Sequence, residues 1–406
     1  MRWVYKAAEE YCESVRDGTH DTPKQTEFGY RLVTGKHIKN GQIDPSDAYY
    51  ISEKDYTKIN ERSLVEQWDV LMSMIGTVGE VAVVQDVPNY AIKNVALFKC
   101  GGSEVRGKWL AYYLRSSEAQ GHMMGHQKGS SQQFLSLKQL RSLPIPVTDV
   151  EYMQKVVDII SVYDDLIENN QKQIKLLEEA AQRLYKEWFI DLRFPGYENT
   201  PIIDGVPQGW RKSVFSDVFT FVRGKSYTSK ELSESDGVLM VNLKNIRAYG
   251  GYKRNVEKRF TGAYKEEQLL VGGDVVMGVT DMTQERRLVG HVALIPSFNE
   301  KVTFSMDLIK LMPSSVSKNY LYCALQYGGY SEQIAPLANG VNVLHLKPEA
   351  MMKMEMLVPD ENTIRTFDIQ FEAVRLKIEA LEKQCNLAVQ ARDRLLPKLM
   401  SGELEV

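Results

Sequence analysis

The polar loops of this sequence could serve catalysis or recognition, and the motifs of catalysis are missing. The chain contains no Asn-Pro-Pro or Asp-Pro-Pro motif of an amino-methyltransferase and no Gly-x-Gly-x-x-Gly. Gly224-Lys225-Ser226 ends like a phosphate-binding loop, but Phe219 stands where the first glycine is required. Pro359-Asp360 is not followed at a suitable distance by Asp-x-Lys or Glu-x-Lys, so a metal-dependent nuclease site is not supported. We therefore expect no active site.

One histidine pair has a spacing that could bind a metal. His122 and His126 would lie on one face of a helix, but no adjacent Glu and no third ligand accompany them. Gly121 and Gly125 argue against a helix, so we interpret residues 121–133 as a polar loop. A surface loop, either plain or in contact with DNA, is favoured over a metal site.

Side chains that hydrogen-bond to DNA gather in the loops. Arg, Lys, Asn and Gln can pair with guanine and adenine edges in the major groove, whereas Ser, Thr and Lys suit phosphates. In the first half of the chain the candidates are Lys36, His37, Lys39, Asn40, Thr77, Lys128, Ser131, Gln132 and Gln133. In the second half they are Arg223, Lys225, Lys244, Asn245, Arg247, Thr280, Thr283, Arg286, Arg287, Asn339 and Asn342. A solvated surface is the alternative for any single residue, while the loops taken as groups favour DNA.

The net charge of −3 does not suggest a DNA-binding protein, but the local distribution of charge is compatible with DNA binding. Residues 148–191 hold ten acidic and five basic side chains, whereas residues 244–259 hold six basic and one acidic. Residues 101–141 hold six basic side chains against two acidic. A phosphate backbone responds to local charge, because salt screens charges beyond about 8 Å.

The length of 406 residues suits two or more domains, and 43% hydrophobic residues are typical of a globular protein. The four cysteines stand singly, which favours reduced thiols and the cytosol over a disulfide framework or a zinc ribbon. No apolar run is long enough to cross a membrane, and the first residues lack the apolar core of a signal peptide. We therefore expect a cytoplasmic protein without a membrane partner.

Two long helices must position the loops. Residues 151–192 carry apolar residues at alternating steps of four and three, without Gly or Pro, which is the heptad pattern of a helix that packs against another helix. The seam is Val156, Ile160, Tyr163, Ile167, Asn170, Ile174, Leu177, Ala181, Leu184 and Trp188. An offset of 211 residues produces a second seam: Phe367, Phe371, Val374, Ile378, Leu381, Cys385, Ala388, Arg392, Leu395 and Leu399. Polar residues at such seams, here Asn170 and Arg392, often fix the register.

The segments before these helices also repeat. Val33-x-x-Lys36-His37-Ile38 corresponds to Val241-x-x-Lys244-Asn245-Ile246, and Asp69-Val70-Leu71-Met72 corresponds to Asp274-Val275-Val276-Met277. The framework is shared, whereas the intervening loops differ in length and content. A duplicated scaffold with unlike loops suits a ligand that has two similar but different binding sites.

Several strings resemble the specificity (S) subunit of Type I restriction-modification systems. They are residues 15–23 (VRDGTHDTP), 183–189 (RLYKEWF) with 194–198 (FPGYE), 206–210 (VPQGW) and 394–404 (RLLPKLMSGEL). The resemblance implies two α/β (α+β) target recognition domains, joined by two long helices that pack as an antiparallel coiled coil with pseudo-twofold internal duplication. The implied parts are target recognition domain 1 (1–150), a central spacer helix (151–192), a linker (193–210), target recognition domain 2 (211–360), a C-terminal spacer helix (361–400) and a tail (401–406).

The resemblance also implies a division of labour. Each recognition domain would read one half of a bipartite site in double-stranded DNA, and the helices would set the spacer between the halves. Two methyltransferase (M) subunits would dock on the helices and use S-adenosylmethionine, and restriction (R) subunits would bring ATP- and Mg-dependent cleavage. The chain itself would bind no cofactor and catalyse nothing. The alternative is a coiled-coil scaffold that binds proteins without DNA.

Overall fold

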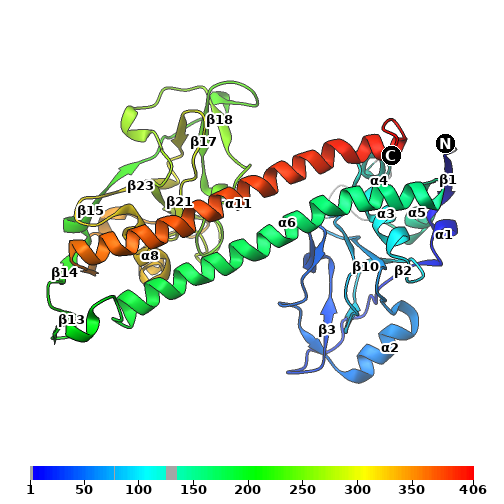
Figure 1. Cartoon of the computed structure of the whole chain (residues 1–406), viewed down its shortest axis with the longest axis horizontal. Helices are drawn as coiled ribbons and strands as arrows, with labels where there is room; N and C mark the ends of the chain where they lie inside the picture. Colours follow the sequence, from blue (N-terminus) through cyan, green and yellow to red (C-terminus); the bar gives the residue numbers. More distant parts are fainter. Residues whose placement is uncertain (1–2, 77, 125–134) are drawn as a thin grey trace. The chain divides into compact units, whose positions relative to one another are not determined.

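The computed structural model describes residues 3–76, 78–124 and 135–406 (Figure 1). The chain forms two compact units, of which the first is made of two separate stretches of sequence and the second of one continuous stretch. Unit 1 comprises Met1–Asn169 and Gln384–Val406, and unit 2 comprises Asn170–Lys383. The division falls inside both long helices, so each unit holds a globular part and one half of each helix. The domain boundaries expected from the sequence, which follow the helix ends, stay a prediction.

Unit 1 is built on an antiparallel sheet of order β2-β10-β7-β8, with β2 (Ser14–Asp17), β10 (Val95–Lys99), β7 (Val70–Ser73) and β8 (Val81–Val83). A second sheet has β3 (Tyr30–Val33) between β6 (Tyr50–Ile51) and β9 (Tyr90–Ile92), and β3 and β9 are parallel. Helix α3 (Glu104–Arg115) packs on the first sheet through fully buried side chains such as Trp109. Smaller elements are β1 (Val4–Ala7), paired with β11 (Pro144–Val147), and α1 (Ala8–Tyr11), η1 (Gly35–His37), β4 (Ile38–Lys39), β5 (Gln42–Ile43), α2 (Glu53–Ser63), α4 (Ser117–Met124) and α5 (Leu137–Arg141).

Unit 2 repeats this plan. Its main sheet has the order β15-β23-β19-β21, with β15 (Phe219–Arg223), β23 (Leu308–Pro313), β19 (Val275–Gly278) and β21 (Val292–Leu294). Its second sheet contains β16 (Leu232–Ser233), β18 (Lys258–Phe260), β17 (Val238–Val241) and β22 (Val302–Phe304), and β17 and β22 are the parallel pair. Smaller elements are β12 (Ile202–Ile203), β13 (Val206–Pro207), β14 (Arg211–Val214), paired with β25 (Glu355–Val358), α7 (Phe215–Val218), η4 (Ser229–Glu231), η5 (Leu243–Asn245), η6 (Glu266–Gln268), β20 (Thr280–Asp281), α8 (Lys318–Tyr327), α9 (Tyr330–Ile334), η7 (Ala335–Leu337), β24 (Leu344–His345) and α10 (Pro348–Met351). The shared strand orders confirm the duplication.

The two long helices are α6 (Val150–Tyr185), extended by a π-helical turn over Lys186–Ile190, and α11 (Glu361–Ser401). In unit 1 they run antiparallel, since the Tyr152 hydroxyl donates to the Leu399 carbonyl (2.9 Å) and the Cys385 thiol donates to the Ile167 carbonyl (3.8 Å). In unit 2 the rings of Tyr185 and Phe367 are 6.4 Å apart, and Arg247 pairs with both Glu178 and Glu382; the later residue of α6 thus lies near the earlier residue of α11, which is the same antiparallel sense. The coiled-coil pairing expected from the heptads is therefore confirmed within each unit.

The seam positions are all buried or half-buried, as the heptad pattern predicts. The polar position Asn170 is only 2% exposed. Within unit 1, Arg392 of α11 forms an ion pair with Asp164 of α6, and the distance between Nη1 and Oδ1 is 2.8 Å. A shift of one helix by a heptad would separate these charges, so the pair favours a single register.

An aromatic cluster joins the half-helices of unit 2 to its sheet. Phe367 is fully buried and its ring lies 4.9 Å from Phe189 and 5.9 Å from Trp188. We expect Phe367→Ala to destabilise unit 2 by about 3–5 kcal/mol, the usual effect of a large cavity in a core. Denaturant unfolding followed by tryptophan fluorescence would measure it. Ile369→Ala is the control, because Ile369 is 69% exposed on the same helix and should change stability by less than about 0.5 kcal/mol. Equal effects of the two substitutions would refute this packing.

One local expectation was wrong: residues 121–124 form the last turn of α4 rather than a loop, and Gly121 sits in that helix with open space beside it. The 193–210 segment, which the sequence predicts as a linker, contains the β12-β13 hairpin, and its residues Phe194 and Trp210 are buried in the core of unit 2. Among the residues that the structure describes, no helix is long and apolar enough to span a bilayer.

Candidate nucleic-acid interface

One end of the main sheet of unit 2 brings the recognition loops together. Strand β20 pairs with β24, which places residues 280–289 beside residues 339–345. The Gln284 side chain donates to the Val341 carbonyl at 2.8 Å and joins the two loops further from the sheet. We call these two loops the reading tip of unit 2. Six of its residues were separate candidates in the sequence, and the fold brings them together: Thr280, Thr283, Arg286, Arg287, Asn339 and Asn342.

A buried carboxylate holds the first loop of the tip in shape. Asp281 is fully buried and accepts hydrogen bonds from the Thr283 amide (2.8 Å) and hydroxyl (2.8 Å) and from the Leu288 amide (2.6 Å). Burial by itself would raise the pKa of Asp281, but these hydrogen bonds outweigh it and lower the pKa below its ordinary value. The contribution of Asp281 to stability is thus present at neutral pH and is lost only as the pH falls through that lowered pKa. Sequence reasoning missed this residue.

Several side chains of the tip point to solvent. Arg287, Asn339 and Asn342 are exposed, as are the apolar neighbours Met282 (76%) and Val341 (87%). Arg286 is half-buried, has a φ of 53°, and its Nε has no hydrogen-bond partner among the described residues. Amide and guanidinium groups next to exposed apolar groups match the edges and methyl groups that bases present in the major groove.

Two candidates at the tip are structural. Thr280 is 7% exposed and its hydroxyl lies 3.5 Å from the His345 ring, and the Thr283 hydroxyl is used by Asp281. These side chains shape the loop rather than offer free groups to a ligand.

Two further candidates, His37 and Asn245, occupy the same turn in the two units. The Thr34 amide donates to His37 Nδ1 (2.8 Å), and the Asn242 amide donates to Asn245 Oδ1 (2.9 Å), so each side chain closes the capping box of a short helix. His37 is 4% exposed and Asn245 fully buried, and burial lowers the pKa of His37. Burial argues against a direct contact of these two side chains with DNA, and in sequence a buried cap and an exposed polar residue look alike.

The neighbouring lysines of these turns are available. Lys36 is exposed and pairs with exposed Asp47 (3.2 Å), and Lys244 is exposed. Lys39 and Asn40 are also exposed, and the backbone amide of Asn40 donates to the Glu80 carboxylate (3.1 Å). Surface positions of this kind remain candidates for phosphate contacts.

Three basic candidates of unit 2 do not belong to the tip. Arg223 pairs with Glu349 (2.7 Å), and Lys225 is half-buried with its backbone bridged to Ser305. Arg247 pairs with Glu178 of α6 and Glu382 of α11. Arg247 therefore connects the globular part of unit 2 to the half-helices of that unit.

Unit 1 has the corresponding position at the end of β7. The Leu135 amide donates to the Met74 carbonyl (3.3 Å), just as the Leu346 amide donates to the Val279 carbonyl (2.8 Å) in unit 2. In both units, therefore, the loop that differs between the two copies ends beside the residue that follows the same strand of the main sheet: Met74 after β7 and Val279 after β19. The candidates Thr77, Lys128, Ser131, Gln132 and Gln133, together with His126, lie outside the described residues.

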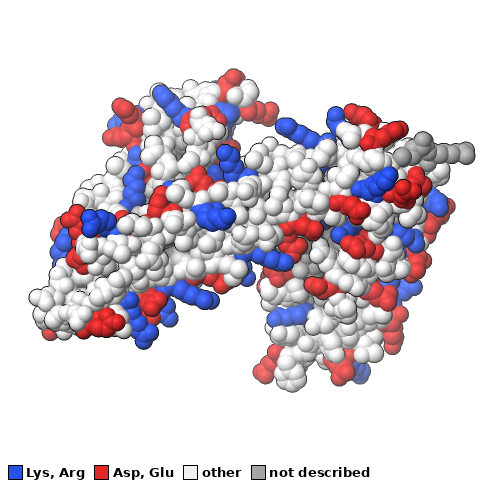
Figure 2. Space-filling view, in the orientation of Figure 1, with Lys and Arg blue, Asp and Glu red and all other residues white. Residues whose placement is uncertain are grey.

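The electrostatics of the interface are local. Figure 2 shows Lys and Arg intermingled with Asp and Glu over both globular parts on the face in view. The residues that the structure describes contain no group of three or more His, Cys, Asp and Glu side chains able to hold a metal ion. The tip combines a buried carboxylate, Asp281, with an exposed surface pair in which Arg287 lies 4.0 Å from Glu285.

Comparison with known proteins relates the first part of the chain to a DNA specificity domain. Residues 3–179 match the family described as the Type I restriction modification DNA specificity domain, and the duplicated fold extends this architecture to the second half of the chain.

The chain is similar along its whole length to specificity subunits of Type I restriction enzymes. It is 24% identical to the MjaIX specificity subunit of Methanocaldococcus jannaschii, over 100% of this chain and 94% of the relative. It is 20% identical to the HindI specificity subunit of Haemophilus influenzae, over 84% of this chain and 88% of the relative. A crystal structure of a Type I S subunit from M. genitalium shares the fold, with a TM-score of 0.58, 16% identity and coverage of 98% and 96% of the two chains. The resemblance predicted from the sequence is confirmed, because these relatives are specificity subunits of Type I restriction enzymes.

Proposed function

We propose that this protein reads a bipartite DNA target, one half with each unit, and that α6 and α11 set the spacer between the halves. The observation that carries the proposal is the duplicated sheet. Both copies keep the same strand order, and the loops that differ between them are attached at corresponding positions. Two copies of one scaffold with unlike loops can read two unlike sequences in the same way. The described side chains that we assign to DNA are exposed Lys36, Lys39, Asn40, Lys244, Arg287, Asn339 and Asn342 and half-buried Arg286.

The proposal includes partner proteins. Two methyltransferase subunits would dock on the long helices, which expose apolar side chains away from the seam: Val162 and Leu166 on α6 in unit 1, and Ile369 and Leu376 on α11 in unit 2. Those subunits would use S-adenosylmethionine, and restriction subunits would supply ATP- and Mg-dependent cleavage. The chain would act in the cytoplasm, where the target DNA is.

Footprinting of the complex between this chain and its methyltransferase subunits tests the proposal. The expected result is protection of two short sequences separated by an unprotected or sequence-independent spacer. Protection of one continuous site would contradict the bipartite reading. A scaffold without DNA binding, the alternative function, would give no affinity that falls steeply with salt.

The reading tip can be tested by removing its charges. We expect Arg286→Gln with Arg287→Gln to weaken binding to the specific DNA by about 10–100-fold, since base contacts of arginine contribute about 1–3 kcal/mol. Fluorescence anisotropy with the specific and a scrambled duplex measures the effect. The matched control is Arg211→Gln with Lys212→Gln, which removes equal charge from exposed positions of β14. A loss as large in the control would show that total charge, and not the tip, determines affinity.

A further inference from the structure

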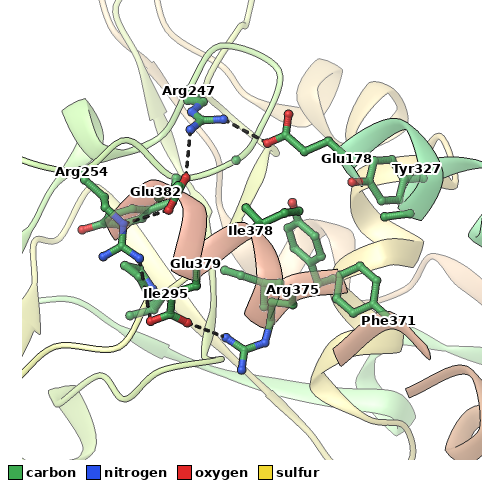
Figure 3. Close-up of a pocket in the computed structure, with 16 residues that line it drawn as sticks. Glu178, Arg247, Arg254, Ile295, Tyr327, Phe371, Arg375, Ile378, Glu379 and Glu382 are labelled. Atoms are coloured by element: carbon green, nitrogen blue, oxygen red, sulfur yellow. Dashed lines mark hydrogen bonds and ion pairs between the residues drawn. The ribbon is translucent and has the colours of Figure 1, made fainter. Parts of the chain in front are cut away.

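A short basic segment of unit 2 binds both half-helices of that unit. In this segment, residues 247–254, Arg247 donates to Glu178 of α6 (3.2 Å) and to Glu382 of α11 (3.3 Å). Arg254 donates to the other carboxylate oxygen of Glu382 (2.8 Å) and lies 3.8 Å from Glu379 of α11. Figure 3 shows the two guanidinium groups turned toward the helix carboxylates. We call residues 247–254 the clamp segment.

The ion pairs of Arg254 are largely removed from water, whereas the Arg247–Glu178 pair is about half exposed, with side chains 42% and 44% exposed. The side chains of Arg254 and Glu382 are each 19% exposed, and that of Glu379 is 21% exposed. Behind them lies a cavity of about 90 Å³ with an apolar wall that includes Phe371 and Ile378 (Figure 3). Charges in such a place lose hydration, which offsets much of their attraction. Their stronger effect is on geometry, because each guanidinium group has few positions in which its hydrogen bonds are satisfied.

The Glu379 carboxylate, which lies beside Arg254, is itself held by other groups. Arg375, one turn before Glu379 on α11, donates to Glu379 (3.2 Å) and to Glu372 (2.8 Å). The Ser297 amide, in the loop after β21, donates to Glu379 at 2.8 Å. The globular part of unit 2 is therefore joined to α11 by a network, not by one flexible ion pair.

The clamp segment also contacts the reading tip. The Tyr249 amide donates to the Arg287 carbonyl at 2.8 Å, and the Gly251 amide donates to the Val292 carbonyl at 2.8 Å. Gly250 has a φ of 105°, a conformation that residues with a side chain rarely adopt, so glycine is favoured at this point of the segment. A continuous path of bonds therefore runs from Glu178 and Glu382 through residues 247–249 to the loop that carries Arg287.

Unit 1 has a comparable connection made of different residues. Arg115, at the end of α3, lies 3.7 Å from Asp164 of α6, and Asp164 pairs with Arg392 of α11. The guanidinium group of Arg115 also donates to the Val81 carbonyl at the start of β8 (3.3 Å). Each unit thus ties its sheet to its half-helices through arginine and carboxylate groups, although the sequences that do so are not repeated.

We propose that Arg247 and Arg254 are positioning residues that fix the reading tip of unit 2 relative to the long helices and thereby restrict the spacer length that the protein accepts. The inference rests on the proposed function and adds a residue-level determinant of spacing to it. Neither arginine needs to touch DNA. Without the clamp, the tip would sample more positions relative to the helices and tolerate more than one spacer.

The test uses Arg247→Gln with Arg254→Gln in the full chain, purified with its methyltransferase subunits. Methylation is measured on duplexes in which the spacer between the half-sites is the preferred one, or is shorter or longer by one base pair. We expect the preference for the right spacer to fall about tenfold, which corresponds to about 1.4 kcal/mol, while the bases required in each half-site stay the same. The conservative variant Arg247→Lys with Arg254→Lys should keep part of the preference, since it keeps the charges.

The matched control is Arg259→Gln with Lys265→Gln, which removes two charges of surface pairs inside unit 2 that do not involve the helices. It should keep the spacer preference. Hydrogen exchange of the free chain gives a readout without DNA: the Tyr249 amide and residues 280–289 should exchange faster in the glutamine variant. Unchanged exchange and an unchanged spacer preference would overturn the inference alone, whereas a wild-type complex with no split target would overturn the proposed function as well.

Discussion

Shortening both long helices by one heptad will shorten the recognised spacer by about three base pairs, because a heptad spans about 10 Å and base pairs are spaced about 3.4 Å apart. Suitable deletions are residues 165–171 of α6 and 383–389 of α11, which keep the seam in phase. They also keep Asp164, Glu382 and Arg392, so the ion pairs that fix the helices to the globular parts remain.

The half-site sequences should not change in this variant, since no residue of either recognition loop is altered. Methylation of a library with random spacers reads both properties in one assay. Deletion of the heptad from α6 alone is the control: the seam would then be out of register with its partner, and the expected result is loss of stability and not a new spacer. An unaltered spacer in the double deletion would mean that something other than these helices measures the distance.

Exchange of residues 211–359 for those of another specificity subunit will change one half-site and leave the other intact. The segment begins with β14 and ends just after β25, and these strands pair with each other, so both junctions lie at one place in unit 2. It carries the whole reading tip, including Asp281 and Arg287. Sequencing of methylated sites in cells that express the chimera would show the new half-site.

The chimera needs the clamp to keep its spacer. Arg247 and Arg254 should therefore be retained where the donor sequence differs, because their partners Glu178 and Glu382 stay in the recipient chain. A chimera without the two arginines is expected to read the same new half-site with a less strict spacer. A change in both half-sites after the exchange would contradict the assignment of one half to each unit.

The framework of this protein could be predicted from the sequence because its requirements are periodic or repeated. The heptad seam predicts a pair of packed helices, since one face of each helix must be buried, and the buried positions Val156, Ile160, Phe367 and Phe371 agree with it. The antiparallel sense of the pair was implied by the family resemblance. The repeated strand residues, such as Val70-Leu71-Met72 and Val275-Val276-Met277, predict one core used twice, and they lie in β7 and β19.

The details of the interface could not be predicted, because they depend on contacts between distant residues. The sequence predicts that Arg247 binds DNA. In the structure its side chain instead donates to Glu382 of α11, which lies 135 positions away in the sequence. Asp281 carries no local signal for the loop that it organises, since one of its donors is Leu288 beyond the turn. Asn245 has the side chain of a base reader, but the hydrogen bonds with Asn242, Lys253 and Glu257 use it inside the fold.

Genome-wide sequencing of methylated adenines in the source organism tests the central claim most directly. If each unit reads one half of a split target, the methylated sites will share two short defined sequences separated by a spacer of constant length and variable composition. Disruption of this chain should remove that methylation while other methylated motifs stay. A single continuous motif that depends on this chain, or methylation unaffected by its loss, would contradict the account.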